Sequence, residues 1–203
     1  RLIGEEFRLQ VGLRQLIEFF ALHHLSAELA VRTYKVYGDS AMELLYDDPY
    51  LLMDEGLDAS FGAVDRFAIE LGVAGDDPRR VEAGILFELS YNLSAGHSFL
   101  PEEKLIAATT QLLSVAPETV QKGLAQAQEA QRVVVDQLAG IKVDYLPQLM
   151  EAEKYCAARL TEFAANSFPQ GQDLEPLLRQ AAEESGLHYS AQQEQAIREA
   201  ASS

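Results

Sequence analysis

A repeat with a spacing of 34 residues constrains the fold of this chain more than any other feature. Ser26 and Ser60 each stand before a helical pattern, and Gly38 and Gly72 follow twelve residues later. A serine oxygen can cap the first turn of a helix, and glycine favours the left-handed conformation that ends one. Between the copies, Pro49 forces a turn because the residue before a proline is disfavoured in a helix. The repeat predicts a tandem of helix-hairpin-helix units.

Apolar residues at helical spacing predict further helices on both sides of the repeat. One covers residues 5–22, and three more follow the repeat, over 79–95, from 98–101 onward, and over 117–131. The period then changes, because residues 132–135 and 141–145 are β-branched runs on either side of Ala139-Gly140. Three helices followed by a β-hairpin is the order of a winged helix.

The last part of the chain is again helical in pattern, with helices expected over 148–165, 173–182 and 191–201 and a loop over 166–172. Cys156 falls on an apolar stripe of the first of these helices, together with Tyr155, Leu160 and Phe163, and is interpreted as a small core residue. The fold class is therefore mostly α. We expect a tandem helix-hairpin-helix segment over 1–75, a winged-helix-like part with one small β-hairpin over 76–145, and a helical linker over 146–203.

Composition limits the classes of function. The formal net charge is −16, with acidic excess in each of the three predicted segments, which argues against strong autonomous binding of nucleic acid. No apolar run approaches the roughly 20 residues that cross a bilayer, so no membrane partner is expected. The single cysteine fits a reducing cytoplasm. The chain starts at Arg1 rather than methionine and ends without a terminating signal, so we expect a segment of a longer protein.

Residues suited to catalysis or metal binding are few. The four histidines have no metal-ligand spacing and there is no cysteine pair, so no metal site is predicted. Asp65 follows the second hairpin, where glycosylases place a catalytic aspartate, but no lysine accompanies it, and a capping or solvated aspartate explains it as well. No GxxxxGK[ST] phosphate loop is present, and the chain alone is expected to be inactive as an ATPase.

Four cations are the candidates for phosphate contacts: Arg79, Arg80, Lys104 and Arg132. The alternative is that they are solvated helix-end charges or ion pairs with nearby acids. The helix over 117–131 would enter a major groove in a winged helix, and its glutamines could read adenine. A polar solvated face explains this helix equally well, and Gln128 is expected to be an exposed position on it.

Several short stretches together resemble the part of RecD-like (RecD/TraA) ATP-dependent DNA helicases that precedes the motor. They are Tyr37-Gly38-Asp39 through Asp48-Pro49-Tyr50, Asp65-Arg66-Phe67-Ala68 with Leu71-Gly72, Asp77-Pro78-Arg79-Arg80 with Ala83-Gly84-Ile85-Leu86, Gly96 to Pro101, and Tyr145-Leu146-Pro147 with Glu153. In addition, Tyr189 to Ile197 is similar to the glutamine motif that introduces the first motor domain.

The resemblance implies a tandem helix-hairpin-helix segment and a winged-helix-like part before a motor that moves 5′ to 3′ on DNA. It implies no cofactor in this chain but ATP and Mg²⁺ in the longer protein, with Gln193 at the position that reads adenine. It also implies that the region positions duplex DNA or partner proteins ahead of the motor. Contact with DNA is expected to be weak and independent of sequence, because few basic side chains stand against the acidic background. The alternative is an interaction scaffold whose hairpins bind no DNA.

One departure from the family pattern concerns the second hairpin. Related chains have a Gly-x-Gly turn there, whose backbone N–H groups can approach a phosphate closely. This chain has Asp58, Ala59, Ser60 and Phe61 instead, with Gly62 next in line. The substitution favours the scaffold alternative for this hairpin.

Overall fold

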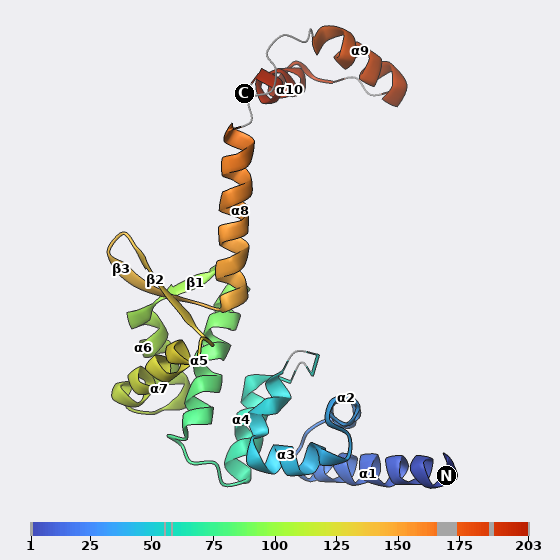
Figure 1. Ribbon diagram of the computed structural model, residues 1–203, viewed down its shortest axis with the longest axis vertical. Coiled ribbons are helices and arrows are strands. Elements are labelled where there is room, and N and C mark those ends of the chain that lie inside the picture. Colours follow the sequence, from blue (N-terminus) through green and yellow to red (C-terminus); the bar gives the residue numbers. More distant parts are fainter. Residues whose placement is uncertain (1, 55, 58, 166–173, 187–188, 203) are drawn as a thin grey trace. The chain divides into compact units, whose positions relative to one another are not determined.

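The computed structural model describes residues 2–54, 56–57, 59–165, 174–186 and 189–202 (Figure 1). They form two compact units, residues 1–150 and residues 151–203. Within the described residues, no helix is long and apolar enough to cross a membrane. The predicted domain boundary at residue 75 falls inside the first unit, in the loop after α4, and the division stays a prediction.

The first unit begins with six short elements that contain the repeat. They are α1 (Leu2–Leu22), α2 (Ala27–Tyr37), the 3₁₀ helix η1 (Gly38–Ser40), α3 (Ala41–Asp47), the 3₁₀ helix η2 (Pro49–Met53) and α4 (Phe61–Glu70). The turn between α3 and η2 lies at Pro49, as the sequence predicts. Its missing N–H costs nothing in the first turn of a helix, and Asp48 accepts the backbone N–H of Tyr50 at 3.0 Å.

The two copies of the repeat share their helix ends but differ in one cap. Ser26 accepts the backbone N–H of Leu29 at 3.1 Å, whereas Ser60 occupies the same position before α4 with no side-chain cap bond. Gly38 and Gly72 both have positive φ, at 59° and 94°. After α4 the N–H groups of Gly72 and Val73 bond to the carbonyls of Ile69 and Ala68, which is the pattern of a Schellman cap. The repeated serines and glycines therefore mark the beginning and end of a helix in both copies.

The rest of the first unit alternates helices with strands. Its elements are α5 (Pro78–Leu93), β1 (Phe99–Pro101), α6 (Glu102–Leu113), α7 (Pro117–Glu129), β2 (Val134–Leu138) and β3 (Ile141–Tyr145). The strands form one antiparallel sheet in the order β1-β3-β2, with Phe99 opposite Tyr145 on one side and Val134 opposite Tyr145 on the other. Positive φ at Ala139 and Gly140 makes the two-residue β2–β3 turn.

The strand β1 corrects the sequence interpretation. Residues 98–101 were expected to start a helix, but α6 starts one residue after Pro101 and residues 99–101 pair with β3. Three residues are too few to show the alternation that identifies a strand. Pairing with β3 stabilises the extended conformation that the local sequence does not specify.

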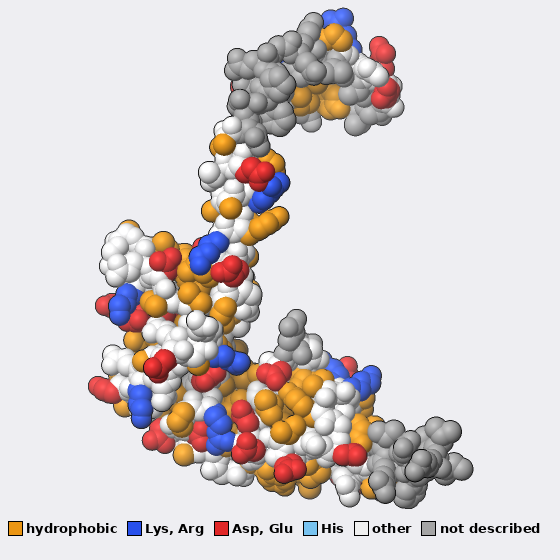
Figure 2. All heavy atoms as spheres, in the orientation of Figure 1, with side chains coloured by type: hydrophobic (Ala, Val, Ile, Leu, Met, Phe, Trp, Pro, Cys, Tyr) orange, Lys and Arg blue, Asp and Glu red, His pale blue; other side chains and the backbone are white. Residues whose placement is uncertain are grey.

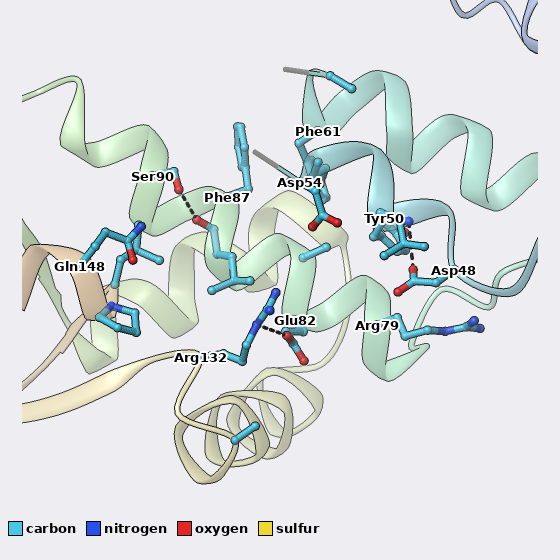
Figure 3. Close-up of a pocket in the computed structure, with 18 of the residues that line it drawn as sticks. Asp48, Tyr50, Asp54, Phe61, Arg79, Glu82, Phe87, Ser90, Arg132 and Gln148 are labelled. Carbon is cyan, nitrogen blue, oxygen red and sulfur yellow. Dashed lines mark hydrogen bonds and ion pairs between the residues drawn. The ribbon is translucent and has the colours of Figure 1, made fainter. Parts of the chain in front are cut away.

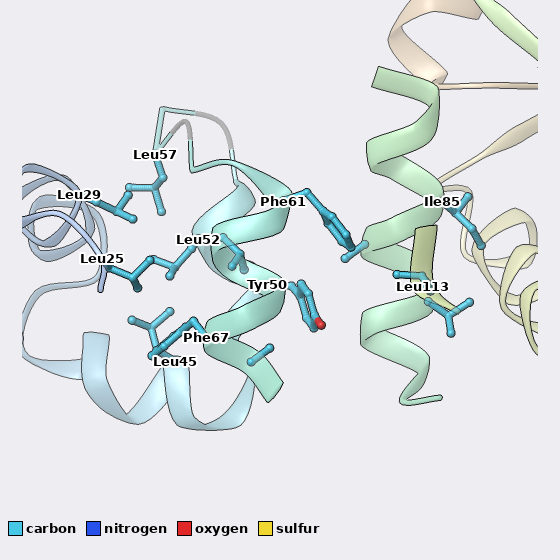
Figure 4. Packing of buried hydrophobic residues seen from close by; sticks show 14 of the residues in the cluster. Leu25, Leu29, Leu45, Tyr50, Leu52, Leu57, Phe61, Phe67, Ile85 and Leu113 are labelled. Atoms are coloured by element: carbon cyan, nitrogen blue, oxygen red, sulfur yellow. The ribbon is translucent and has the colours of Figure 1, made fainter. Parts of the chain in front are cut away.

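One apolar core runs through both halves of the first unit (Figure 4). It includes Phe20, Leu52 and Phe67 in the hairpin part and Ile85 and Leu105 around α5, all fully buried. In Figure 4 the rings of Tyr50 and Phe61 extend from η2 and the start of α4 toward α5. A smaller cluster consists of Val143 and Tyr145 of β3 together with Met150.

The second unit comprises most of α8 (Pro147–Ala165), with α9 (Leu174–Ser185) and α10 (Ala191–Ser202). The predicted core position of Cys156 is wrong, because its side chain is exposed. Tyr155, Leu160 and Phe163 are likewise 59–67% exposed, so the stripe faces solvent rather than a core of the described residues. The predicted loop over 166–172 and the predicted cap at Asp173 lie outside the described residues.

Candidate functional site

Arg80 lies in a buried ion-pair network. Its Nε and Nη2 donate to the two carboxylate oxygens of Asp65 at 2.8 and 2.9 Å, and Nη1 donates to the carbonyls of Gly75 and Leu113 at 2.7 and 3.1 Å. Tyr50 adds its hydroxyl to Asp65 at 2.7 Å. Arg80 is 8% exposed, and with every guanidinium nitrogen engaged it cannot reach a phosphate without breaking these bonds. Its role in this fold is structural, and so is that of Asp65.

Arg79 and Arg132 are more accessible, but each already has a carboxylate partner. Arg79 donates through Nε and Nη2 to Asp77 at 3.0 and 2.8 Å, and through Nη1 to the carbonyl of Asp47. The bonds from Arg79 lower the pKa of Asp77 below its ordinary value. Arg132 pairs with Glu82 at 3.0 Å and its side chain is 57% exposed. Both charges are locally neutralised.

Lys104, on α6, is exposed and makes no ion pair with the residues that the structure describes. Lys122, on α7, is exposed in the same way. Over the face drawn in Figure 2, acidic and basic side chains are interspersed rather than gathered into a basic patch. The four predicted cations therefore do not form one surface: one is buried, two are paired and one is free of such partners.

A cleft of about 920 Å³ lies within the first unit, between α5, the start of α8 and the second hairpin, which consists of η2, α4 and the turn that joins them (Figure 3). Phe61 and Asp54 line it from the hairpin, Glu82 and Phe87 from α5, and Arg132 from the segment after α7. The Phe61 and Phe87 rings stack with centroids 5.0 Å apart. Figure 3 shows the Arg132–Glu82 ion pair among the lining residues, with Arg132 pointing toward Glu82 of α5.

The sequence patterns did not predict this cleft, although α5 carries a signal for it. The periodicity predicts one apolar stripe of Val81, Ile85, Leu86, Leu89 and Leu93. Val81, Ile85 and Leu89 are buried as predicted, but Leu93 is 45% exposed and Leu86 lies at the cleft. Ala83, Leu86 and Phe87 make a second apolar stripe at spacings of three and four residues, and it is this stripe that faces the cleft. The pattern of an amphipathic helix with one apolar face does not distinguish this second stripe from the first.

The turn of the second hairpin has no Gly-x-Gly, and Asp58 lies outside the described residues. Ala59, Ser60 and Phe61 line the cleft, and Phe61 is 5% exposed with its ring against α5. Gly62 is exposed in the first turn of α4, and a Cβ there would meet no atom within 4 Å. The start of α4 is thus occupied in packing the hairpin against α5.

The exposed face of α7 is polar, but Gln128 does not belong to it. The carboxamide of Gln128 donates to Asp144 at 2.7 Å, joining α7 to β3, so its expected exposure is wrong. Asp144 is fully buried and burial raises its pKa to about 6. Its second oxygen, Oδ2, has no hydrogen-bond partner among the described residues. Gln121, Lys122 and Gln126 remain as exposed side chains of α7.

Gln193 lies in the first turn of α10 and forms a capping box with Ser190. Its Oε1 accepts the Ser190 backbone N–H at 2.8 Å, and its own N–H donates to the Ser190 hydroxyl at 3.3 Å. The side-chain NH₂ group and one lone pair of Oε1 remain for a further partner. Adenine offers a matching acceptor and donor at N7 and N6. Among the described residues, no group of three or more His, Cys, Asp or Glu side chains could hold a metal ion.

The short paired helices around tight turns define a helix-hairpin-helix protein. Residues 9–99 match the family model described as the ATP-dependent RecD2 DNA helicase HHH domain. The chain is also 29% identical over 173 residues to the ATP-dependent RecD2 DNA helicase of Deinococcus radiodurans, an alignment that covers 80% of this chain and 23% of that protein. The matched part of the chain thus spans less than a quarter of the length of this relative.

These matches confirm the resemblance drawn from the sequence motifs. Residues 9–99 are similar to the helix-hairpin-helix domain of the RecD2 helicases. Both matches are to RecD2 helicases, and the first of them extends past α4 to include α5.

Proposed function

We propose that this chain is the accessory N-terminal region of a 5′→3′ RecD-like DNA helicase and that it positions DNA for a motor located elsewhere in the longer protein. The observation that carries the proposal is the helix-hairpin-helix match over residues 9–99. The order of α5, β1, α6, α7, β2 and β3, with a β1-β3-β2 sheet, supports the reading of residues 78–145 as a winged-helix module.

The contact with DNA would be weak and independent of sequence. The exposed lysines Lys104 and Lys122 lie on α6 and α7, and Arg79 and Arg132 would have to exchange a carboxylate for a phosphate. The net charge of −16 opposes long-range attraction of a polyanion. Binding by so few charges would be much weaker than that of an autonomous DNA-binding domain.

ATP and Mg²⁺ would belong to the motor, where they would supply the energy of translocation. From this chain, Gln193 would hold the adenine through its remaining amide donor and acceptor, and the capping box with Ser190 would fix its orientation. The chain has no phosphate loop of its own. The cytoplasm, where such a helicase would act, is the proposed location.

The test is a fluorescence-anisotropy titration of a short duplex and of a single strand at low and at moderate salt. We expect a slope of log K against log salt of about 1 to 3 in magnitude on the duplex, because each neutralised phosphate adds about 0.9. Lys104→Ala/Lys122→Ala should lower the affinity and reduce the slope by about 1 to 2. Lys154→Ala, which removes a lysine paired with Glu151 on α8, is the control and should change neither value.

A second function is favoured by the charge pairing around the cleft. Arg79, Arg80 and Arg132 all bind carboxylates of this chain, so the candidate phosphate contacts are satisfied internally. We propose, as the alternative, that the region is a scaffold that holds partner proteins. Absence of DNA binding at low salt would select this alternative.

A further inference from the structure

The helix α5 is apolar on two sides, and the described structure buries one of them fully and the other only in part. On the first side, Gly123 of α7 approaches so closely that a Cβ there would lie 2.5 Å from Val81, and Ile85 is fully buried. On the second side, Leu86 and Phe87 are half-buried and form part of the cleft wall. A helix that is apolar on both sides is normally covered on both sides.

We propose that this cleft binds a short segment of a partner protein that carries an aromatic or aliphatic anchor next to a lysine or arginine. The proposal deepens the scaffold function given above and does not depend on DNA binding. The anchor would pack on Leu86 and Phe87, between the hairpin and the start of α8. The cationic side chain would face the acidic end of the cleft at Asp48 and Asp54.

The size of the cleft fits a peptide rather than a single side chain. Its volume of about 920 Å³ is at the upper end of the roughly 300–1,000 Å³ of small-molecule pockets, and it is open to solvent. Half-buried apolar residues line it from two elements: Leu51 and Met53 from η2 and Leu86 and Phe87 from α5. Such a floor suits two or three neighbouring side chains of an extended or helical segment.

The charges around the cleft determine which charge the partner's side chain should carry. At the hairpin end, Asp48 caps η2 and Asp54 accepts the Tyr37 hydroxyl at 2.7 Å, and neither has an ion-pair partner among the described residues. The cations of the cleft, Arg79 and Arg132, are neutralised by Asp77 and Glu82. The surplus is therefore negative, and it attracts a basic side chain.

The same charges disfavour a single nucleic-acid strand in this cleft. The Phe61–Phe87 stack and Tyr91, whose ring lies 5.7 Å from that of Phe87, could offer a stacking surface to bases. A strand would also bring phosphates next to Asp48 and Asp54 without an unpaired cation among the described lining residues to balance them. A peptide with an apolar anchor and a basic side chain would contact both the apolar floor and the acidic end of the cleft.

The experiment uses the full chain as bait for a phage-displayed library of random short peptides. An enriched peptide is then synthesised with a fluorescein label and titrated by anisotropy against the chain and its variants. We expect enriched sequences to combine a Phe, Leu, Met or Tyr anchor with at least one Lys or Arg. An oligothymidine strand with the same label is titrated in parallel.

Two matched pairs of variants locate the binding site. Leu86→Ala should weaken the labelled peptide at least tenfold, whereas Leu138→Ala, which shortens an exposed leucine on β2 away from the cleft, should change its affinity less than twofold. Asp54→Lys should weaken it at least fivefold, and Asp136→Lys, also an exposed aspartate but on β2, should not. Circular dichroism of each variant verifies folding, and Asp54→Lys alone remains a test if Leu86→Ala unfolds.

Three outcomes of the peptide experiment would overturn the proposal. They are the absence of any enriched peptide, enrichment of acidic peptides, and binding that is equally affected by the cleft variants and their controls. A fourth is binding of the oligothymidine strand that is lost in the Leu86→Ala variant, because it would assign the cleft to nucleic acid instead. Failure of the duplex titration described above leaves these outcomes unchanged, so the two proposals are tested separately.

Discussion

At the scale of single residues, the described charges of this protein mostly act within the fold. Arg80 joins the loop before α5 and the end of α6 to α4 through Gly75, Leu113 and Asp65. A bidentate pair of this kind positions elements, because each guanidinium nitrogen fixes a direction as well as a distance. Asp144, in contrast, is a buried carboxylate that is only partly satisfied. One of its oxygens accepts a hydrogen bond from Gln128, and the other has no partner among the described residues.

We predict that Asp144→Asn stabilises the protein at pH 8 and has little effect at pH 4. The pKa of Asp144 is raised to about 6, so the folded state favours the protonated carboxyl. Its contribution to stability is complete below the unfolded pKa near 3.8, falls as pH rises toward about 6, and stays low above that. The asparagine keeps an oxygen that accepts the hydrogen bond from Gln128, and it removes the buried charge. Removing the charge should raise the free energy of unfolding at pH 8 by roughly 1–3 kcal/mol at most.

The measurement is thermal unfolding of both proteins followed by circular dichroism between pH 4 and pH 8. Asp136→Asn, which neutralises an exposed aspartate on β2, is the control for the change in net charge. An equal gain at both ends of the pH range, or a gain shared by Asp136→Asn, would contradict the assignment of the effect to the burial of Asp144.

At the scale of elements, close helix contacts are set by glycine. Gly123 lets α7 approach α5, and a Cβ at this position would lie 2.5 Å from Val81 Cγ1 and 3.3 Å from Val81 Cβ. Valine cannot rotate both of these atoms away, because its Cβ is fixed to the backbone. The contact therefore depends on the missing side chain rather than on backbone freedom.

We predict that Gly123→Ala destabilises the protein by about 1–3 kcal/mol, although alanine is favoured over glycine within a helix by about 1 kcal/mol. The control is Gly62→Ala in the first turn of α4, where a Cβ meets no atom within 4 Å. It should be neutral or slightly stabilising. Urea unfolding measures both free energies, and a Gly123→Ala variant as stable as the parent would show that the two helices can separate without cost.

The elements also show which parts of the fold the sequence could predict. Helix ends at Ser26, Gly38 and Gly72 and the turn at Gly140 were predictable, because local backbone chemistry decides them. β1 was not, because three residues pair only when β3 is already in place. The exposed stripe that includes Cys156 has a core-like period, and periodicity alone cannot say whether another part of the protein covers it.

The candidate site was predictable only in part, for the same reason. The sequence identifies the four cations but not their partners, since Asp65 and Arg80 are 15 residues apart and meet through folding. It does not separate the two apolar sides of α5, because Ala83 and Leu86 read as additions to a single stripe. Local patterns give helices and turns, whereas pairing and exposure depend on contacts between distant residues.

At the scale of the whole molecule, the cooperative core lies within residues 1–150. The main apolar cluster has buried members from Leu16 to Leu146, and the smaller cluster ends at Met150. In the second unit the described part of α8 beyond Met150 is exposed along most of its length. The hairpin part and the helix–strand part share the larger cluster, so they should unfold together rather than as separate domains.

We predict that a chain ending after Met150 keeps the same thermal midpoint as the full chain within about 4 °C, the shift that roughly 1 kcal/mol produces in domains of 150–250 residues. It should show one transition, because Phe20, Phe67 and Ile85 belong to one core. Differential scanning calorimetry measures the midpoint and the enthalpy.

The matched comparison ends after Tyr145 and so removes Leu146 and Met150, which are 8% and 5% exposed. It should melt lower than the chain ending after Met150, because both apolar clusters lose a buried member. Two transitions in the chain ending after Met150 would show instead that the hairpin part and the helix–strand part fold independently, as the predicted boundary at residue 75 implies.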